Sequence, residues 1–369
     1  MSFSVRPAIQ RCARLSDFFA AWDVGEGDLI VTNAYVLEPQ LDGKKAPCDV
    51  LYQEQYGTGE PSDEMVDAML ASIAGKTYTR IIAIGGGTVI DLAKLFVFGS
   101  GLDCEAIFSM GAELPKARSL VVIPTTCGTG SEVTGISIVE FKKKQTKLGL
   151  AVPALFADEA VLIPALLKTL PYEVFATSSI DALIHAVESF VSPKATPFTR
   201  AFGRQAIEII LSGYRDLAKT GARRLPEVLD DFLTASTLAG VAFGNAGCAA
   251  VHALSYPIGG NYHVPHGKAN YIVFEQVFRA YREKKADLSP LENVLMPALD
   301  CADRSQVWDA LFGLLAVIYD NTSLSALGAD ADACGEMAVS VTANQQRLLV
   351  NNPVPLTTED IRDIYTRCL

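Results

Sequence analysis

Three of the four histidines in this 369-residue chain lie within VHALSYPIGGNYHVPHGKAN, residues 251–270. The fourth, His185, follows Asp181 by four residues in SSIDALIHAVES, a run of helical periodicity, so both side chains share one helix face. The prolines and glycines after His252 predict that a helix ends there and that the chain turns back, which brings His266 beside His252. Imidazoles that converge with a carboxylate are good ligands for a divalent cation such as Fe(II) or Zn(II). The alternative for any single histidine is a hydrogen-bonded core or surface position.

Two glycine-containing clusters in the first half of the chain each follow an apolar run. AIGGGTVIDLAK (83–94) places three glycines before a helical pattern, and PTTCGTGSEVT (124–134) holds five hydroxyl side chains and two glycines. Glycine lets backbone N–H groups approach a pyrophosphate at a helix N-terminus. The spaced G-x-G-x-x-G pattern is absent, and a tight turn without a ligand is the alternative. Because open α/β sheets bind ligands at the carboxyl ends of their strands, two such loops together favour a dinucleotide.

The elements that must position these residues change in character along the chain. Near-continuous apolar runs at 28–33, 49–53, 80–86 and 119–125 predict buried parallel strands, 61–75 predicts a helix, and 135–141 with 147–152 predicts a hairpin around KKKQT. After about residue 171, alanine- and leucine-rich helical patterns dominate. We therefore predict a Rossmann-like α/β dinucleotide-binding domain over 1–165. An all-helical domain that holds metal and substrate is predicted over 166–369.

Composition excludes several classes of protein. A formal net charge of -11 argues against nucleic-acid binding, which needs a basic face. The eight cysteines are scattered without a C-x-x-C pair, as expected of reduced thiols in a cytoplasm. No apolar run approaches the ~20 residues that span a bilayer, and the first residues lack the apolar core of a signal peptide. We expect a cytoplasmic protein with a small-molecule substrate.

The ordered motifs GGGTVID, PTTCGTGSE, DALIHAVES and HALSYPIGGNYHVPHG, followed by RLLVNNPVPLTTEDI (347–361), resemble those of the iron-dependent (group III) alcohol dehydrogenases over essentially the whole chain. Within that family the chain is most similar to the branch that interconverts 4-hydroxybutyrate and succinate semialdehyde. The resemblance implies a dehydroquinate synthase-like architecture and a reversible hydride transfer between a nicotinamide cofactor and a primary alcohol or aldehyde. It further implies a divalent metal, Fe(II) in preference to Zn(II), and a homo-oligomer.

Two other kinds of enzyme are alternatives. One is another metal-dependent alcohol or glycerol dehydrogenase. The other is a lyase resembling dehydroquinate synthase, whose phosphorylated substrate needs several lysines and arginines, whereas residues 245–270 contain only Lys268.

The resemblance also assigns residues by their match to the family's motifs. The metal ligands match Asp181, His185, His252 and His266. The pyrophosphate turn matches Gly86, Gly87, Thr88 and Asp91. Hydroxyls lining the cofactor match Thr125, Thr126 and Thr129, and a lysine that reaches the cofactor's ribose matches Lys147.

Three positions need separate interpretation. Asn33 stands where many members have an aspartate that binds the adenosine ribose and repels a 2′-phosphate, so we expect NAD, with NADP left open. Tyr256 replaces a histidine near the nicotinamide; its hydroxyl reaches the catalytic pocket, or its ring only packs. His263 lies outside the ligand set, and its candidate roles are proton relay, binding of the substrate carboxylate, or bracing of the bend.

Overall fold

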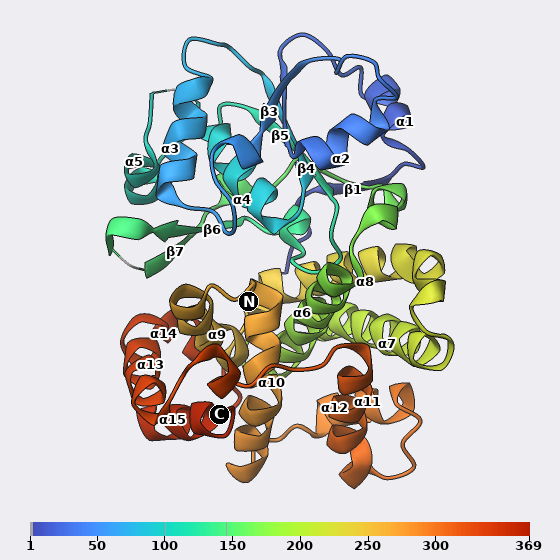
Figure 1. Ribbon diagram of the computed structural model, residues 1–369, viewed down its shortest axis with the longest axis vertical. Helices are drawn as coiled ribbons and strands as arrows, with labels where there is room; N and C mark the ends of the chain where they lie inside the picture. Colours follow the sequence, from blue (N-terminus) through green and yellow to red (C-terminus); the bar gives the residue numbers. More distant parts are fainter. Residues whose placement is uncertain (1–2, 100, 145) are drawn as a thin grey trace. The chain divides into compact units, whose positions relative to one another are not determined.

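The computed structural model describes residues 3–99, 101–144 and 146–369. It divides into two compact units, and each contains its own packed elements. Val5–Leu170 forms an α/β unit, and Pro171–Leu369 forms a helical unit to which Ser4 also belongs. Figure 1 shows the α/β unit in blue to green and the helical unit in green to red.

A six-stranded parallel sheet forms the centre of the α/β unit. Its strands lie in the order β1-β8-β5-β4-β2-β3, and every neighbouring pair is parallel. The strands are β1 (Ala8–Arg11), β2 (Asp28–Thr32), β3 (Asp49–Tyr52), β4 (Arg80–Gly85), β5 (Ser119–Pro124) and β8 (Glu159–Leu162). The four strands predicted from apolar runs are β2, β3, β4 and β5, so the predicted parallel sheet is confirmed. The prediction lacks β1, whose sequence AIQR has no apolar run and is exposed along its whole length, and it also lacks the short strand β8 (EAVL).

Helices cover the sheet, which explains its unbroken apolar strands. Every residue of β2 is buried. Residues on one face, among them Leu29, Ile81 and Leu120, share a core with α3 (Asp63–Ser72), α4 (Gly87–Leu95) and α5 (Cys104–Met110). The remaining helices of the unit are α1 (Leu15–Ala21) and α2 (Ala34–Leu37). Helix α3 confirms the helix predicted over 61–75, and it begins after Ser62, whose Oγ accepts the N–H of Met65 at 3.3 Å.

The predicted hairpin is also confirmed. Strands β6 (Ile136–Phe141) and β7 (Thr146–Ala151) pair in antiparallel register. The turn between them contains the 3₁₀ segment Lys142–Lys144, and Gln145 lies outside the described residues. Short 3₁₀ segments connect other elements of the unit: Glu38–Gln40, Gln53–Gln55, Phe96–Phe98, Ser131–Val133, Pro153–Leu155 and Pro164–Thr169.

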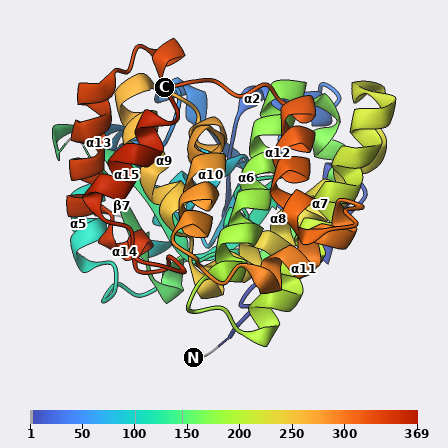
Figure 2. The same ribbon diagram turned by 90° about the horizontal axis from the view of Figure 1, so that it is seen from below.

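The helical unit is built around α6, whose inner residues are almost all buried. Its helices are α6 (Tyr172–Val191), α7 (Pro197–Thr220), α8 (Leu225–Ala246), α9 (Ala250–Tyr262), α10 (His266–Glu283), α11 (Ser289–Ala298), α12 (Val307–Ile318), α13 (Ala331–Asn344), α14 (Gln346–Leu349) and α15 (Thr358–Thr366). Helix α6 packs against α7, α8 and α10, and α10 packs against α9 (Figure 2). This arrangement places α6, α9 and α10 beside one another.

The predicted end of a helix at His252 is wrong. His252 is the third residue of α9, which continues through Pro257 to Tyr262. An internal proline removes one backbone hydrogen bond and costs about 3 kcal/mol, but buried Leu254 and Ile258 hold α9 in the core on either side of it. The chain instead bends by 105° between α8 and α9 and reverses after His263.

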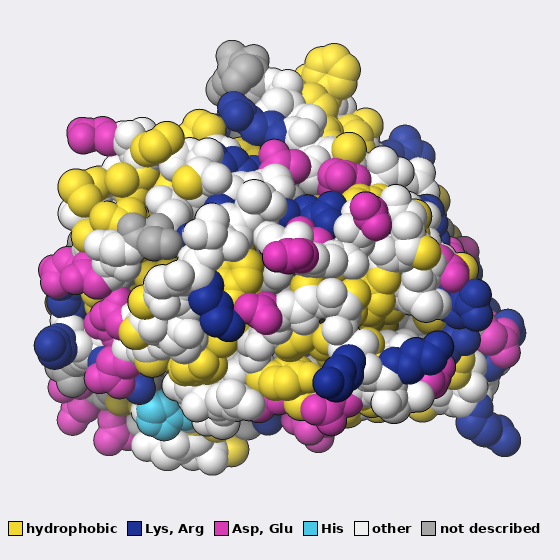
Figure 3. Space-filling view, turned by 90° about the horizontal axis from the view of Figure 1, so that it is seen from above, with side chains coloured by type: hydrophobic (Ala, Val, Ile, Leu, Met, Phe, Trp, Pro, Cys, Tyr) yellow, Lys and Arg dark blue, Asp and Glu magenta, His cyan; other side chains and the backbone are white. Residues whose placement is uncertain are grey.

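The surface carries charges of both signs, and one helix is both long and strongly apolar. On the face drawn in Figure 3, basic and acidic side chains lie interspersed without a large patch of either sign. Among the described residues, α6 alone is by itself long and apolar enough to cross a membrane, and 78% of its apolar window is buried in the structure. Helices α8 and α9 meet the same length and composition test only when taken together across their bend.

Candidate metal centre and nucleotide site

Three helices bring the four predicted metal ligands together. Asp181 and His185 lie one turn apart on α6, His252 lies in the first turn of α9, and His266 is the first residue of α10. One possible ligand atom from each lies within 4.8 Å of every other. Three of the side chains are buried, and that of His266 is 34% exposed. The cluster therefore has one side accessible to a small molecule.

The distances within this cluster suit a shared ion better than hydrogen bonds. Asp181 Oδ1 lies 3.6 Å from His252 Nε2 and 3.9 Å from His266 Nε2, and Asp181 Oδ2 lies 3.9 Å from His185 Nδ1. These separations are too long for hydrogen bonds. Two ligand atoms that are each about 2.1 Å from one ion lie up to about 4.2 Å apart. The side chains are thus spaced for one divalent cation.

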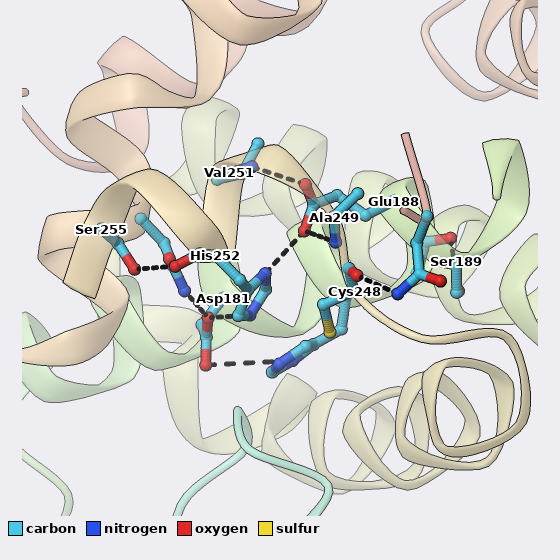
Figure 4. A network of polar contacts seen from close by, with 12 residues as sticks. Asp181, Glu188, Ser189, Cys248, Ala249, Val251, His252 and Ser255 are labelled. Carbon is cyan, nitrogen blue, oxygen red and sulfur yellow. Dashed lines mark hydrogen bonds and ion pairs between the residues drawn. The ribbon is translucent and has the colours of Figure 1, made fainter. Parts of the chain in front are cut away.

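Glu188, three residues after His185 on α6, orients His252. Its Oε2 lies 2.6 Å from His252 Nδ1, and its two carboxylate oxygens accept the N–H groups of Ala249 and Val251 at 3.1 and 2.7 Å. A carboxylate that accepts from these donors keeps the imidazole proton on Nδ1 and turns Nε2 toward Asp181 (Figure 4). His252 Nε2 is buried and has no hydrogen-bond partner among the described residues. This unsatisfied acceptor fits a metal ligand.

The charges of the cluster follow from the same contacts. Burial opposes the charged form of Asp181, but the three histidines outweigh it and hold the pKa of Asp181 below its ordinary value. Burial also opposes a charge on His252, yet Cys248 and Glu188 raise the pKa of His252 well above its ordinary value. A cation bound at Nε2 supplies the positive charge that Glu188 favours. The donor set therefore fits a metal with a 2+ charge.

A second group of three residues, Glu188, Cys248 and His252, also places possible ligand atoms within 4.8 Å of one another. The Glu188 carboxylate is already occupied by two backbone N–H groups and by His252. Burial raises the pKa of the Cys248 thiol, which disfavours the thiolate that a metal needs. We therefore assign the cation to the Asp181 side of His252.

Two further residues fix the geometry of α10 at the cluster. Asn270, one turn after His266, donates from Nδ2 to Asp181 Oδ1 at 2.6 Å and lies 3.2 Å from His266 Nε2. A Cβ on Gly267 would lie 2.4 Å from the carbonyl oxygen of Thr177 on α6. Only glycine allows α10 to begin this close to α6. The sequence interpretation missed Asn270, and its position four residues after His266 was the available signal.

The structure separates the two remaining residues of the bend. Tyr256 lies one turn after His252 on α9, its ring centroid is 6.4 Å from that of His266, and burial raises its pKa. His263 caps the far end of α9 in the left-handed conformation (φ 53°) and is exposed. Tyr256 therefore adjoins the metal cluster, whereas His263 makes no hydrogen bond, ion pair or ring contact with it among the described residues. Their catalytic roles stay predictions.

The two glycine-containing loops of the α/β unit lie side by side. In the sheet register, Gly85 at the end of β4 pairs with Pro124 at the end of β5. A Cβ on Gly87 would lie 2.8 Å from Thr129 Cγ2, and a Cβ on Gly86 would lie 3.2 Å from a methyl carbon of the same loop. Direct packing between the loops therefore explains the need for glycine at 87, whether or not a ligand binds.

The backbone at the start of α4 is suited to an anion. Gly86 is the N-cap residue of α4, and no described side chain caps this helix end. Uncapped N–H groups at a helix N-terminus favour negative charge such as a pyrophosphate. The neighbouring hydroxyl groups lie close by, but Thr88 Oγ1 already donates to the carbonyl oxygen of Gly59 at 3.2 Å. Thr125 is buried and its N–H donates to Gly85 at 3.0 Å.

Asp91 takes part in a buried network that joins α4 to the second loop. Its Oδ1 accepts from Ser131 Oγ at 2.6 Å, and its Oδ2 accepts the N–H of Ile138 at 3.0 Å. The fully buried Lys94 donates to Ser131 Oγ and to the carbonyl oxygen of Ile136, both at 2.6 Å. Burial lowers the pKa of Lys94, and Asp91 opposes that shift. This lysine escaped sequence interpretation because a helical lysine usually lies at the surface.

At the end of β2, Asn33 is buried and paired with Glu54, an acid in the 3₁₀ segment after β3 that sequence interpretation missed. Asn33 Nδ2 lies 2.8 Å from Glu54 Oε2, and the N–H of Ala34 donates to Glu54 Oε1 at 2.7 Å. Asn33 Nδ2 also donates to Gln53 Oε1 at 3.1 Å. The charge that Asn33 lacks is therefore present on its neighbour. The signal in the sequence was Glu54 directly after a predicted strand.

Lys147, predicted at the ribose of the cofactor, lies on β7 and forms an ion pair with Glu60. The pair is largely shielded, since the lysine side chain is 11% exposed and the glutamate side chain 32% exposed. This contact holds the Lys147 ammonium beside the segment that precedes α3. Its contact with a cofactor stays a prediction.

Comparison with known proteins gives a consistent result for both units. The family model described as iron-containing alcohol dehydrogenase matches residues 13–164, and the model for the C-terminal part of the Fe-containing alcohol dehydrogenase family matches residues 175–369. The chain is 44% identical over 363 residues to the 4-hydroxybutyrate dehydrogenase of Clostridium kluyveri, a match that covers 98% of each chain.

Solved structures show the same fold. An alcohol dehydrogenase from Oenococcus oeni superposes with a TM-score of 0.87 at 22% identity and covers 100% of both chains. A sulfoacetaldehyde reductase from Bifidobacterium kashiwanohense, solved with NAD+, gives a TM-score of 0.84 at 22% identity and covers 100% of this chain and 98% of its own. The predicted combination of a parallel-sheet domain and an all-helical domain is thereby confirmed.

Proposed function

Because this chain belongs to the iron-containing alcohol dehydrogenase family, we propose that it transfers a hydride reversibly between NAD and the terminal hydroxyl group of 4-hydroxybutyrate. Oxidation consumes 4-hydroxybutyrate and NAD+ and yields succinate semialdehyde, NADH and a proton. The observation that carries this proposal is the 44% identity with the Clostridium kluyveri 4-hydroxybutyrate dehydrogenase across 98% of both chains. The metal-like cluster on α6, α9 and α10 supports it independently.

The helical unit is the proposed metal and substrate domain, corresponding to the predicted range 166–369. Asp181, His185, His252 and His266 are the residues that would hold a divalent cation, for which the family favours Fe(II) over Zn(II). Glu188 keeps the proton on His252 Nδ1, and Asn270 orients Asp181. When bound, the cation supplies Lewis acidity toward the substrate oxygen, and NAD supplies the hydride acceptor.

The α/β unit is the proposed NAD-binding domain, corresponding to the predicted range 1–165. The uncapped start of α4 supports pyrophosphate binding at Gly86, Gly87 and Thr88. Thr125, Thr126 and Thr129 belong to the adjoining loop and are proposed to line the cofactor. Asp91 holds that loop through Ser131. Lys147 is proposed to reach a ribose of the cofactor, and Asn33 is proposed to lie at the adenosine ribose.

The test begins with anaerobic purification and metal analysis. Turnover is then followed as NADH formation on 4-hydroxybutyrate, 1,4-butanediol, 1-butanol and glycerol, each with NAD+ and with NADP+. We expect stoichiometric iron and the highest kcat/KM for 4-hydroxybutyrate with NAD+. Higher kcat/KM for glycerol or for 1-butanol than for the acid would contradict the proposed substrate, and activity unchanged by metal removal would contradict the metal centre.

Three other features remain predictions that this preparation also tests. Light scattering of the purified protein measures the predicted homo-oligomer. Fractionation of the source cells tests the predicted cytoplasmic location. Kinetics of the His263→Ala protein separate proton relay from carboxylate binding, since a lost relay slows every alcohol and a lost carboxylate contact slows only the acid.

A further inference from the structure

Arg347 is a positively charged residue near the metal cluster that the proposed function has not yet used. It lies on α14, which packs against α9, the helix that carries His252. Its side chain is exposed, and it forms no ion pair with a carboxylate among the residues that the structure describes. In a chain of net charge -11, an arginine with no acidic partner is available to an external anion.

The segment that carries Arg347 is fixed in place. Asn351, one turn later, donates from Nδ2 to the carbonyl oxygen of Cys248 at 2.7 Å and lies 3.5 Å from that of Arg347. A Cβ on Gly247 would lie 2.5 Å from Asn351 Nδ2, so the bend before α9 and this segment are in close contact. Arg347 is therefore held beside the start of α9.

Tyr256 links Arg347 to the metal cluster. It lies four residues after His252, so the two side chains share one face of α9. Its ring centroid is 6.4 Å from that of His266. The Arg347 guanidinium is close enough to oppose the rise that burial causes in the pKa of Tyr256. One tyrosine thus separates a guanidinium from the histidines that would hold the cation.

We propose that Arg347 binds the carboxylate of an ω-hydroxy acid whose hydroxyl end lies at the metal cluster, and that Tyr256 positions the guanidinium. This inference rests on the proposed function, to which it adds the residue that selects an acid over a neutral alcohol. A guanidinium binds a carboxylate through two parallel N–H···O contacts. A four-carbon ω-hydroxy acid contains five bonds of about 1.5 Å between its terminal oxygens, and so spans at most about 7 Å.

The two cations considered from the sequence are less well placed. His263 follows His252 by eleven residues, which is about 16 Å along a straight helix and more than twice the length of the substrate. Lys268 lies two residues after His266 on α10 and hence about 200° around that helix. Its Nζ lies instead 5.9 Å from the ring centroid of Tyr319. Arg347, in contrast, lies on the helix that packs against α9 and acts on Tyr256.

Steady-state kinetics of the metal-loaded enzyme test the proposal with two substrates. 4-Hydroxybutyrate and 1,4-butanediol share the reacting end, but the diol carries a hydroxymethyl group where the acid has its carboxylate. For Arg347→Gln we expect kcat/KM for the acid to fall about tenfold to a hundredfold, mainly through KM, while the diol changes less than about threefold. Arg347→Lys should give a kcat/KM for the acid between those of the unaltered enzyme and Arg347→Gln, because lysine keeps the positive charge but cannot donate two parallel N–H groups. Tyr256→Phe should lower kcat/KM for the acid by a smaller factor.

Arg223→Gln provides the matched control, since Arg223 is an exposed arginine of the same unit in a short 3₁₀ segment. It should leave both substrates unchanged. Butyrate, which has the carboxylate but no hydroxyl group, gives a reading that does not depend on turnover. Its binding, measured by ligand-observed NMR, should be weakened by Arg347→Gln and not by Arg223→Gln.

The outcomes separate this inference from the proposed function. If the unaltered enzyme oxidises the acid well and Arg347→Gln leaves that activity or affects acid and diol equally, the inference is overturned and the proposed function stands. A selective loss of the acid in His263→Ala but not in Arg347→Gln likewise overturns it. If the unaltered enzyme oxidises the diol but not the acid, the proposed substrate is wrong and the inference fails with it.

Discussion

The candidate sites in the two units are built from different kinds of atoms. In the helical unit, three of the chain's four histidines and Asp181 converge through their side chains from three separate helices. In the α/β unit, the corresponding features are the backbone of Gly86 and Gly87 and the small side chains of the neighbouring loop. The first site depends on chemical identity at four positions, and the second depends on the absence of side-chain volume.

This difference predicts how each site responds to substitution. Removing one metal ligand removes a bond that no neighbour replaces, so the loss should be nearly complete. Adding a methyl group to a packed glycine costs a limited amount of strain, which a compensating deletion can relieve.

His266→Ala should give the largest loss. We expect metal content and turnover to fall to the level of the metal-free protein, while the helical unit keeps its fold because the His266 side chain is one-third exposed and leaves no closed cavity. Metal is measured by mass spectrometry and folding by circular dichroism. His263→Ala, three residues earlier and exposed, is the matched control and should keep its metal. Near-full metal content in His266→Ala would overturn the four-ligand assignment.

Glu188→Gln should weaken the metal site without abolishing it. Glutamine keeps the size of the side chain but loses the charge that holds the proton on His252 Nδ1. Loss of such a supporting contact usually lowers metal affinity about tenfold to a hundredfold. We expect that decrease in a chelator competition titration, together with recovery of turnover at excess metal.

Ser189→Ala is the control for Glu188→Gln, since Ser189 is buried on the same helix and its hydroxyl donates to the Ala186 carbonyl oxygen of that helix. It should leave metal affinity unchanged. An equal loss in both variants would mean that α6 has been disturbed generally and that Glu188 has no specific role at His252.

The same contrast explains what could be predicted from the sequence. Apolar runs and helical periodicity were sufficient for β2 to β5, α3 and the hairpin, whereas the exposed strand β1 has no apolar run and the short strand β8 was missed. Histidine is rare here, so its clustering indicated the residues of the metal cluster directly. The predicted path of the chain between His252 and His266 was wrong, because packing around Leu254 and Ile258 keeps α9 helical through Pro257.

The supporting residues were hidden for a different reason. Glutamate, asparagine, lysine and arginine are common at helix surfaces, and nothing in the sequence separates a buried Lys94 from an exposed lysine. Glu54 became visible only when the sheet order placed β3 beside β2. Such residues act through neighbours that are distant in sequence, and the fold is needed to find them.

Gly87→Ala should have an intermediate and reversible effect. Its new Cβ would lie 2.8 Å from Thr129 Cγ2, so one of the two loops must shift. Overpacking of this kind costs about 1–3 kcal/mol in the free energy of unfolding, and we expect weaker NAD+ binding as well. Adding Thr129→Ser removes the opposing methyl group and should restore most of the stability, as measured by urea denaturation.

The control for the glycine prediction is Gly25→Ala, because nothing lies within 4 Å of a Cβ at that position in the same unit. It should change neither stability nor NAD+ binding. If Gly87→Ala proved neutral, or if Thr129→Ser failed to rescue it, contact between the two loops would not be the reason for glycine at this position.

The smallest effect is expected for cofactor choice, where a charge acts through a neighbour. We expect NAD+ to be preferred over NADP+, and we expect Asn33→Asp to widen that preference by placing a second negative charge at the end of β2. Both dissociation constants are measured by calorimetry. If Asn33→Asp left the ratio of the NADP+ and NAD+ dissociation constants unchanged, Asn33 would not lie at the ribose site.

Glu54→Gln should narrow the preference for NAD+ over NADP+, which is the opposite of the effect expected for Asn33→Asp. The carboxylate of Glu54 accepts from Asn33 and from the N–H of Ala34, so it places a negative charge beside the position assigned to the adenosine ribose. A glutamine of the same size removes the charge that would repel a 2′-phosphate. Because this group is partly exposed, the interaction is worth roughly 1 kcal/mol, and NADP+ binding should strengthen about fivefold relative to NAD+. Glu26→Gln, an exposed acid of the same unit, should leave the ratio unchanged. Equal shifts in the two variants would show that total charge alone, and not the Glu54–Asn33 contact, sets the preference.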